Sequence, residues 1–288
     1  MKTGIYPGMG MAEYHGWKLD KAKLIDGPIS CSMLKRFAQN PYAWRWSPDF
    51  KQTEAMATGS LFDAALTDSD ALSDNYVFSE FSDFRTKAAK EWKTEMEATG
   101  KTIVLEHDFN HAIEAAKRCR EHKVAGPLLD GAEFQVGVIG EAEVEGYSFS
   151  IPAKCLIDVL PAREECLVDY KTISTGLDDK SIREAIGKYK YHWQAAFYLT
   201  LFNKVATDQH AKEFKFIFQN PTTLEIRVVT LSADAFALGT VSVKLAVKEF
   251  LRCAKQGIKS RYEATDEEID LMPYHTMAED EWQTAQIQ

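Results

Sequence analysis

The 288-residue sequence lacks the marks of several protein classes. No apolar stretch approaches the ~18 residues that a membrane-spanning helix needs, and no apolar core follows the lysine near the start. We therefore expect a cytoplasmic protein without a membrane partner or signal peptide. The five cysteines form no CxxC pair, so we expect reduced, mostly buried thiols instead of a zinc site or a four-cysteine cluster.

Basic residues are fewer than acidic ones. The sequence has 34 Lys and Arg against 43 Asp and Glu, a net charge of −9. Proteins that coat nucleic acid are usually basic, because phosphate contacts drive their affinity. The charge balance argues against a coating role but allows an enzyme with a local basic groove, since acids that bind metal also lower the total.

The pattern of the chain changes near Pro127. Before it, apolar residues recur at helical spacing; after it, alternating apolar and polar residues predict strands. We expect irregular structure over 1–28, helices over 30–40, 53–70, 83–100, 106–122, 179–205 and 233–257, and strands over 133–144, 147–160, 166–174, 213–220 and 224–232. This order predicts a single domain over 1–262, with a central mixed sheet between helices, and an acidic tail over 263–288.

Ionisable residues interrupt two of the apolar strands. Asp158 ends the apolar run at 155–157, and Asp169 and Lys171 follow the run at 166–168. Strands this apolar are usually buried, and a buried carboxylate is costly unless a partner compensates it. The presence of these charged residues in apolar strands therefore indicates a chemical role.

Strand pairing is expected to bring these residues together. If residues 144–146 form the first turn of an antiparallel meander, Glu133 lies beside Asp158. The second turn pairs Asp158 with Asp169 or a close neighbour, and alternation puts Asp169 and Lys171 on one face. Three carboxylates and a lysine are thus predicted to converge on one patch of the sheet.

Such a patch suits metal-dependent hydrolysis of a phosphodiester. Carboxylate oxygens hold Mg²⁺, which lowers the pKa of a bound water and neutralises charge on the phosphate. A neighbouring lysine can orient or deprotonate that water and stabilise the transition state. An exposed surface hairpin with an Asp–Lys ion pair of little energetic value would show the same spacing. The apolar flanks and the convergence of Glu133 favour a buried cluster with a chemical role.

With these residues placed, the sequence resembles the PD-(D/E)XK nuclease superfamily, and more narrowly the RecE-type (exodeoxyribonuclease VIII) phage and prophage exonucleases. Asp158 matches the first motif aspartate, with Ile157 where proline is often found. "Asp169-Tyr170-Lys171" matches the (D/E)XK motif, and Gln194 and Tyr198 match the helical QxxxY motif. Opening segments such as "ATGSLFDAAL" resemble the family's first helices.

The resemblance covers most of residues 14–262. It implies an α/β (α+β) fold with a restriction-endonuclease-like core over about 127–256, in which helices flank a central mixed sheet. It also implies metal ligation by Glu133, Asp158, Asp169 and the Tyr170 carbonyl, activation of water by Lys171, and contact of Gln194 and Tyr198 with the DNA strand. The metal would be Mg²⁺, with Mn²⁺ as the alternative.

One position departs from the family pattern. RecE-type exonucleases usually carry a metal-binding histidine in the helix that contains Asp63 here. An aspartate also binds Mg²⁺ through oxygen, so Asp63 is either a further ligand or a plain helix residue. The basic residues Lys188, Lys190 and Arg183 likewise either line a phosphate track or form a solvated face.

The resemblance implies a DNA exonuclease that degrades linear duplex DNA, 5′ to 3′, for phage-type recombination or repair. Its partners would be double-stranded DNA ends, a single-strand annealing protein or recombinase, and further copies of itself in a ring. A catalytically weakened DNA-end-binding or partner-docking module of the same fold is the first alternative. A related endonuclease is the second, although no separate recognition region is evident.

Overall fold

The computed structural model describes residues 2–48, 54–67, 72, 75–146, 148–260, 262, 266, 268 and 269. Met1–Gly257 forms one compact unit and Ile258–Gln288 a second. The predicted acidic tail lies outside the described residues except for three positions.

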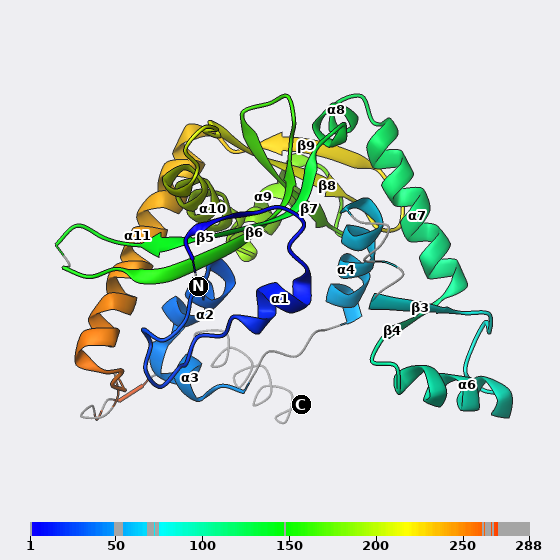
Figure 1. Ribbon diagram of the computed structural model, residues 1–288, viewed down its shortest axis with the longest axis horizontal. Helices are drawn as coiled ribbons and strands as arrows, with labels where there is room; N and C mark the ends of the chain where they lie inside the picture. Colours follow the sequence, from blue (N-terminus) through cyan, green and yellow to red (C-terminus); the bar gives the residue numbers. More distant parts are fainter. Residues whose placement is uncertain are drawn as a thin grey trace, which may run out of the picture. The chain divides into compact units, whose positions relative to one another are not determined.

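A seven-stranded mixed sheet forms the centre of the unit (Figure 1). Its strands are β1 (Gly4–Tyr6), β2 (Ile29–Ser30), β5 (Glu133–Ala142), β6 (Ile151–Leu160), β7 (Cys166–Thr172), β8 (Glu213–Gln219) and β9 (Ile226–Thr230). The order is β1-β5-β6-β7-β8-β9, with β2 paired to β6. Strands β5, β6 and β7 form the predicted antiparallel meander, whereas β7 and β8 run parallel.

Strand β6 has two successive neighbours on one of its edges. Strand β5 pairs along its other edge, from Ile151 to Leu160. On the shared edge, β2 pairs in parallel at Ala153 and Lys154, and β7 pairs antiparallel at Val159. Asp158 therefore lies where the edge of β6 passes from β2 to β7.

Helices flank the sheet, which confirms the predicted fold class. They are α1 (Met11–Gly16), α2 (Cys31–Gln39), α3 (Pro41–Trp46), α4 (Glu54–Thr67), α6 (Lys87–Glu97), α7 (Glu106–Glu121), α8 (Ala125–Leu129), α9 (Asp179–Lys188), α10 (Tyr191–Val205) and α11 (Ala233–Gln256). Side-chain caps fix several starts: Ser30 accepts a hydrogen bond from Met33 N, and Ser232 accepts one from Ala235 N. None of the helices in the described ranges is long and apolar enough to cross a membrane.

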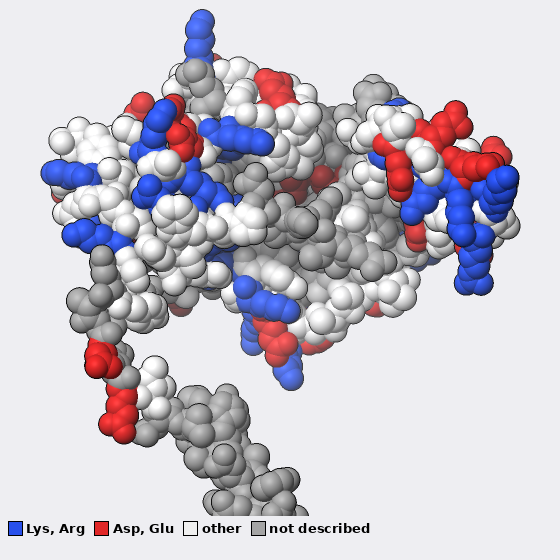
Figure 2. All heavy atoms as spheres, turned by 90° about the horizontal axis from the view of Figure 1, so that it is seen from below, with Lys and Arg blue, Asp and Glu red and all other residues white. Residues whose placement is uncertain are grey.

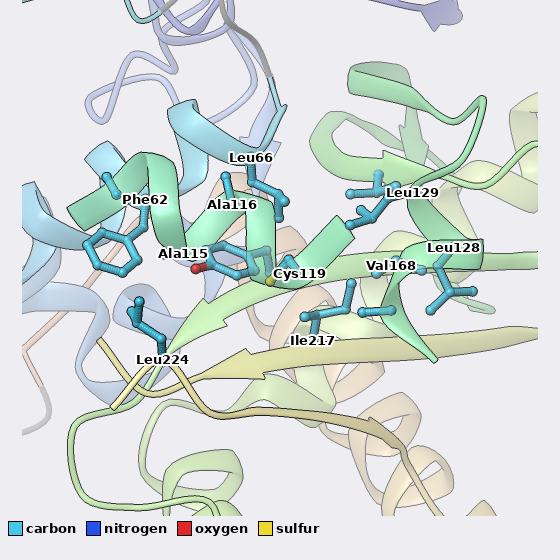
Figure 3. Packing of buried hydrophobic residues seen from close by; sticks show 14 of the residues in the cluster. Phe62, Leu66, Ala115, Ala116, Cys119, Leu128, Leu129, Val168, Ile217 and Leu224 are labelled. Atoms are coloured by element: carbon cyan, nitrogen blue, oxygen red, sulfur yellow. The ribbon is translucent and has the colours of Figure 1, made fainter. Parts of the chain in front are cut away.

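Two helical layers bury the sheet. Helices α4, α7 and α8 pack over β7 and β8, where small side chains such as Ala115 and Ala116 let α7 approach Val168 and Ile217 closely (Figure 3). Helix α10 packs on β5 and β6, and α2 and α11 pack against α10. The five cysteines are buried free thiols, as expected.

Two expectations about secondary structure are wrong. Residues 1–28 contain β1 and α1, because the buried Lys154 ammonium donates to the carbonyls of Tyr14 and Trp17 and ties this segment to β6. The helix expected over 179–205 is two helices, since Lys190 adopts a left-handed conformation with φ of 53° between α9 and α10. A second, two-stranded sheet joins β3 (Tyr76–Ser79) and β4 (Thr102–Leu105).

Candidate active site

The meander brings the two motif aspartates face to face. Val159 pairs with Val168, so Asp158 of β6 lies opposite Asp169 of β7, as the sequence predicts. The Tyr170 amide donates a 3.0 Å hydrogen bond to Asp158 Oδ2. The side chain of Asp169 is 1% exposed, and that of Asp158 is 16% exposed, so both carboxylates are largely removed from water.

Lys171 supplies positive charge between these aspartates. Its Nζ lies 2.5 Å from Asp169 Oδ2 and 3.9 Å from Asp158 Oδ2. It also lies 5.7 Å from the centroid of the Tyr191 ring. Burial alone would lower the pKa of Lys171, but Asp169 and Asp158 raise it above its ordinary value, so the side chain stays an ammonium.

Asp63 approaches the same cluster from α4. Its Oδ2 accepts a 3.2 Å hydrogen bond from Gln135 Nε2, whereas its Oδ1 is buried and has no hydrogen-bond partner within the described part of the chain. Burial raises the pKa of Asp63 to about 6, opposed by Lys171 and assisted by Asp169. These electrostatic interactions place Asp63 beside the motif residues.

Asp158, like Asp63, has a raised pKa. Burial, followed by repulsion from Asp169 and Asp63, raises the pKa of Asp158 well above its ordinary value. Lys171 and the Tyr170 amide oppose this rise but do not cancel it. Three acids and one ammonium therefore share a buried site with an excess of potential negative charge.

Gln194 joins the cluster from α10, as the family motif implies. Its Nε2 donates a 2.5 Å hydrogen bond to Asp169 Oδ1, and the side chain is buried. Tyr198 lies one turn further along α10, and its ring packs edge-on against Phe214 with 6.1 Å between centroids. Burial raises the pKa of the Tyr198 hydroxyl well above its ordinary value.

Glu133 does not lie beside Asp158. It is exposed and pairs with Leu160, so the register differs from the one expected. Gln135 stands opposite Asp158 instead, between the pairs Phe134–Val159 and Val136–Ile157. Its backbone has a φ of 50°, a conformation that a non-glycine residue adopts at a cost.

The side chain of Tyr170 points away from those of Asp169 and Lys171, which lie on the other face of β7. The Tyr170 carbonyl faces the site, where it accepts a 3.3 Å hydrogen bond from Lys171 Nζ. The Tyr170 side chain lies in the core under α7, and its hydroxyl donates to Gln219 Oε1 at 2.5 Å. Alternation along β7 therefore separates the site from the core.

The predicted basic residues differ in their distance from the site. Arg183 pairs with Asp179 at 3.5 Å on the surface of α9. Lys188 is exposed, and Lys190 lies over the Trp193 ring at the start of α10. The space-filling view shows basic side chains spread over the left side of the lower face, and further ones mixed with acidic side chains at its right end (Figure 2).

Lys35 of α2 is a site neighbour that sequence reasoning missed. Its Nζ donates to the Tyr189 carbonyl at 3.0 Å, and burial lowers its pKa, with further interactions from Lys171, Asp169 and Lys190. Gln135 was missed as well, because a polar residue in an alternating strand carries no signal of its own. The position of Lys35 in an opening helix was the available clue for that residue.

The oxygen atoms of this cluster are of the kind that a hard divalent cation prefers as ligands. Asp63 Oδ1 and Gln135 Oε1 are buried oxygens without hydrogen-bond partners in the described ranges, and the three acids exceed the one lysine in charge. No three His, Cys, Asp or Glu side chains in those ranges are arranged to hold a metal ion together. Mg²⁺ commonly uses only one or two protein carboxylates and completes its shell with water and phosphate, so the residues still fit it.

Comparison with known proteins agrees with this geometry. A family described as a PDDEXK-like domain of unknown function (DUF3799) matches residues 30–270. The chain belongs to this family. The match spans the site from α2 to α11, so the PD-(D/E)XK-like nature of the fold is confirmed, whereas the RecE type remains a prediction.

Solved structures extend the comparison. The chain is similar to a candidate exonuclease from Eubacterium rectale, with 17% identity and a TM-score of 0.56, over 94% of this chain and 98% of that one. A second structure, SSO0001, has 16% identity and a TM-score of 0.31 over 71% of this chain and 89% of that one, too low to carry an argument. No curated protein matches the sequence. These likenesses show a shared fold.

Proposed function

We propose that this member of the PDDEXK-like family is a metal-dependent DNA nuclease. One observation carries the proposal: the Lys171 ammonium lies between Asp158 and Asp169, and Asp63, which interacts electrostatically with Lys171 and Asp169, has a buried oxygen without a hydrogen-bond partner among the described residues. A purely structural cluster would pair its charges and satisfy its buried oxygens. This cluster instead keeps an excess of acids, at the point where the edge of β6 passes from β2 to β7.

One or two of the Asp158, Asp169 and Asp63 carboxylates would hold Mg²⁺, or Mn²⁺ in its place, together with the Tyr170 carbonyl and water. The bound ion supplies charge neutralisation at the phosphate and a more acidic water. Gln194 holds Asp169 in one orientation through its 2.5 Å hydrogen bond, and Gln135 does the same for Asp63. Both amides fix the acids before substrate arrives, which is what preorganised sites require.

Lys171 acts in this proposal as a charge and not as a base. Because Asp169 and Asp158 raise its pKa, it holds its proton at neutral pH and stabilises negative charge that develops on the phosphate. The proton of the attacking water goes to a carboxylate.

The finer proposal is an exonuclease of the RecE type that acts 5′ to 3′ on ends of linear duplex DNA. The motif order and the likeness to the Eubacterium rectale structure support it. Lys35, Lys188 and Lys190 would guide the strand, and Tyr198 would support it. A single-strand annealing protein or recombinase and a ring of copies complete the proposal.

The first test compares linear with closed-circular duplex DNA, each with Mg²⁺, with Mn²⁺ and with a chelator. The variant is Lys171→Ala, and the matched control is Lys123→Ala, an exposed lysine after α7. We expect loss of linear DNA only, dependence on the metal, and a rate for Lys171→Ala lower by about 100-fold or more. Lys123→Ala should cleave at the wild-type rate.

The other outcomes discriminate among the alternatives. Cleavage of the circle would favour an endonuclease of the same fold. Binding of DNA ends without cleavage in either metal would favour the weakened module, and Asp63→His would then be the first reversion to assay. End-labelled substrates assign the polarity.

A further inference from the structure

Helix α11 carries an apolar stripe on its outer surface. Leu238, Val241 and Leu245 are 60%, 55% and 62% exposed. Spacings of three and four residues align them along one side of the helix. Large apolar side chains this exposed, and contiguous, mark a surface that meets something other than water.

The opposite side of α11 is already used. Gly239 packs so closely on the His192 carbonyl of α10 that a Cβ would lie 2.2 Å from its oxygen. Ala246, Val247 and Phe250 are buried. The outer stripe is therefore additional to the face that holds α11 in the fold, and α11 runs along the outside of the unit (Figure 1, orange).

Charged residues continue the stripe at both ends. Asp234 lies four residues before Leu238, and Lys248 lies three residues after Leu245. The full spacing of 4-3-4-3 is the one by which two helices pack side by side in a coiled-coil seam. Both charged residues are exposed, and no ion pair joins either of them to another described residue.

We propose that this stripe binds the same stripe of a second copy of the chain, with the two α11 helices antiparallel. Antiparallel packing brings the acidic end of one stripe to the basic end of the other, whereas parallel packing would set Asp234 against Asp234 and Lys248 against Lys248. The stripe is thus complementary to itself about a two-fold axis near Val241. Such a contact closes at two protomers and does not by itself build a ring.

The interface is small. The 24-residue helix is about 36 Å long, and the stripe occupies its middle turns. Standard stable interfaces bury about 800 Å² per partner, more than one helix face offers. We therefore expect a reversible dimer with a Kd of about 1–100 μM.

The first test measures association by sedimentation equilibrium between about 1 and 100 μM, in wild type and in Leu245→Glu. The control is Ile113→Glu, which also places an acid at an exposed apolar position on a helix, α7, away from the stripe. We expect a concentration-dependent dimer in wild type and the control, and at least a tenfold larger Kd in Leu245→Glu. A wild type that stays monomeric throughout overturns the proposal.

Charge reversal tests the antiparallel arrangement without touching the apolar residues. Asp234→Lys and Lys248→Asp should each raise the Kd at least threefold, and the double variant should restore it. A double variant no tighter than the single ones overturns the antiparallel pairing. Circular dichroism of each variant excludes loss of the fold as the cause, and the measurement needs no DNA, so it is independent of the proposed nuclease activity.

Discussion

Two lysines of the central sheet, the buried Lys154 and the half-buried Lys171, meet opposite surroundings. Lys171 on β7 lies between Asp169 and Asp158, and these acids raise its pKa despite burial. Lys154 on β6 donates to the carbonyls of Tyr14 and Trp17, each at 2.5 Å, and lies over the Tyr14 ring, 4.3 Å from its centroid. Burial lowers its pKa to about 8.

The difference distinguishes a lysine of the candidate active site, Lys171, from a lysine with a structural role, Lys154. Lys154 uses its hydrogens to hold α1 on the sheet, and no carboxylate of the described residues forms an ion pair with it. Lys171 balances acids that burial would otherwise force to take up protons. A buried lysine is therefore not a sign of chemistry in itself; the excess of carboxylates around it is.

The largest expected effect comes from making the same substitution at both lysines. Lys171→Met leaves Asp169 and Asp158 without their cation, so we expect the free energy of unfolding to fall by about 3–5 kcal/mol at neutral pH. Lys154→Met loses hydrogen bonds to two carbonyls but also removes a buried charge, and should cost about 1–3 kcal/mol. Urea denaturation of both variants measures the two costs.

The comparison of these costs also has a pH control. At low pH the acids around Lys171 are protonated, so the cost of Lys171→Met should shrink, whereas that of Lys154→Met should not. Equal costs for the two variants at every pH would mean that the carboxylates do not need the Lys171 ammonium.

A second effect distinguishes the lysines in alkaline solution. Between about pH 8 and pH 10.5 the unfolded chain keeps a proton on Lys154 that the folded chain has lost, so this residue makes stability rise with pH. The rise, wild type minus Lys154→Met, should reach roughly 2–3 kcal/mol. Lys171 has a raised pKa, so its contribution should stay constant over this window and fall only at higher pH.

This second effect is read from unfolding curves at pH 7, 8, 9 and 10 for wild type and both methionine variants. Subtraction of each variant removes the titration of all other groups. A Lys154→Met curve parallel to wild type would show that this lysine is not desolvated in the folded protein.

A third, smaller effect tests how Asp63 is held. Gln135→Met removes the hydrogen bond to Asp63 Oδ2 while it keeps the length of the side chain. Supporting residues of this kind typically change metal affinity about 10- to 100-fold, and we expect the lower end. Calorimetric titration with Mn²⁺, without DNA, measures it, with Asp63→Ala as the reference for full loss. Unchanged affinity in Gln135→Met would mean that Asp63 needs no support from the amide.

Sequence reasoning succeeded where a residue conflicts with its surroundings. Asp158, Asp169 and Lys171 stand out because apolar strands do not normally carry them, and strand alternation then fixes their common face. The sheet and most helices follow from periodicity. The break at Lys190 was missed, because the helical pattern continues across it and only the backbone turns.

The register of β5 and β6 shows the limit. A turn expected over 144–146 placed Glu133 in the site, but the observed pairing of Glu133 with Leu160 shifts the ladder and brings Gln135 opposite Asp158. Apolar residues occupy both faces of these buried strands, so alternation does not decide between neighbouring registers. A glutamate was the more conspicuous residue, and it was the wrong one for that position.

The smallest expected effect tests in solution whether Glu133 lies outside the site, as the observed register requires. Glu133→Gln should change the rate of DNA cleavage less than twofold and the free energy of unfolding by less than about 0.5 kcal/mol, because Glu133 is exposed and lies beside Leu160. The same assays on Asp158→Asn supply the contrast, with a loss of cleavage of about 100-fold or more. If Glu133→Gln instead cleaved as poorly as Asp158→Asn, the acid at the end of β5 would belong to the site. The comparison between a catalytic cluster on β6 and β7 and a purely structural remainder of the sheet would then have to be redrawn.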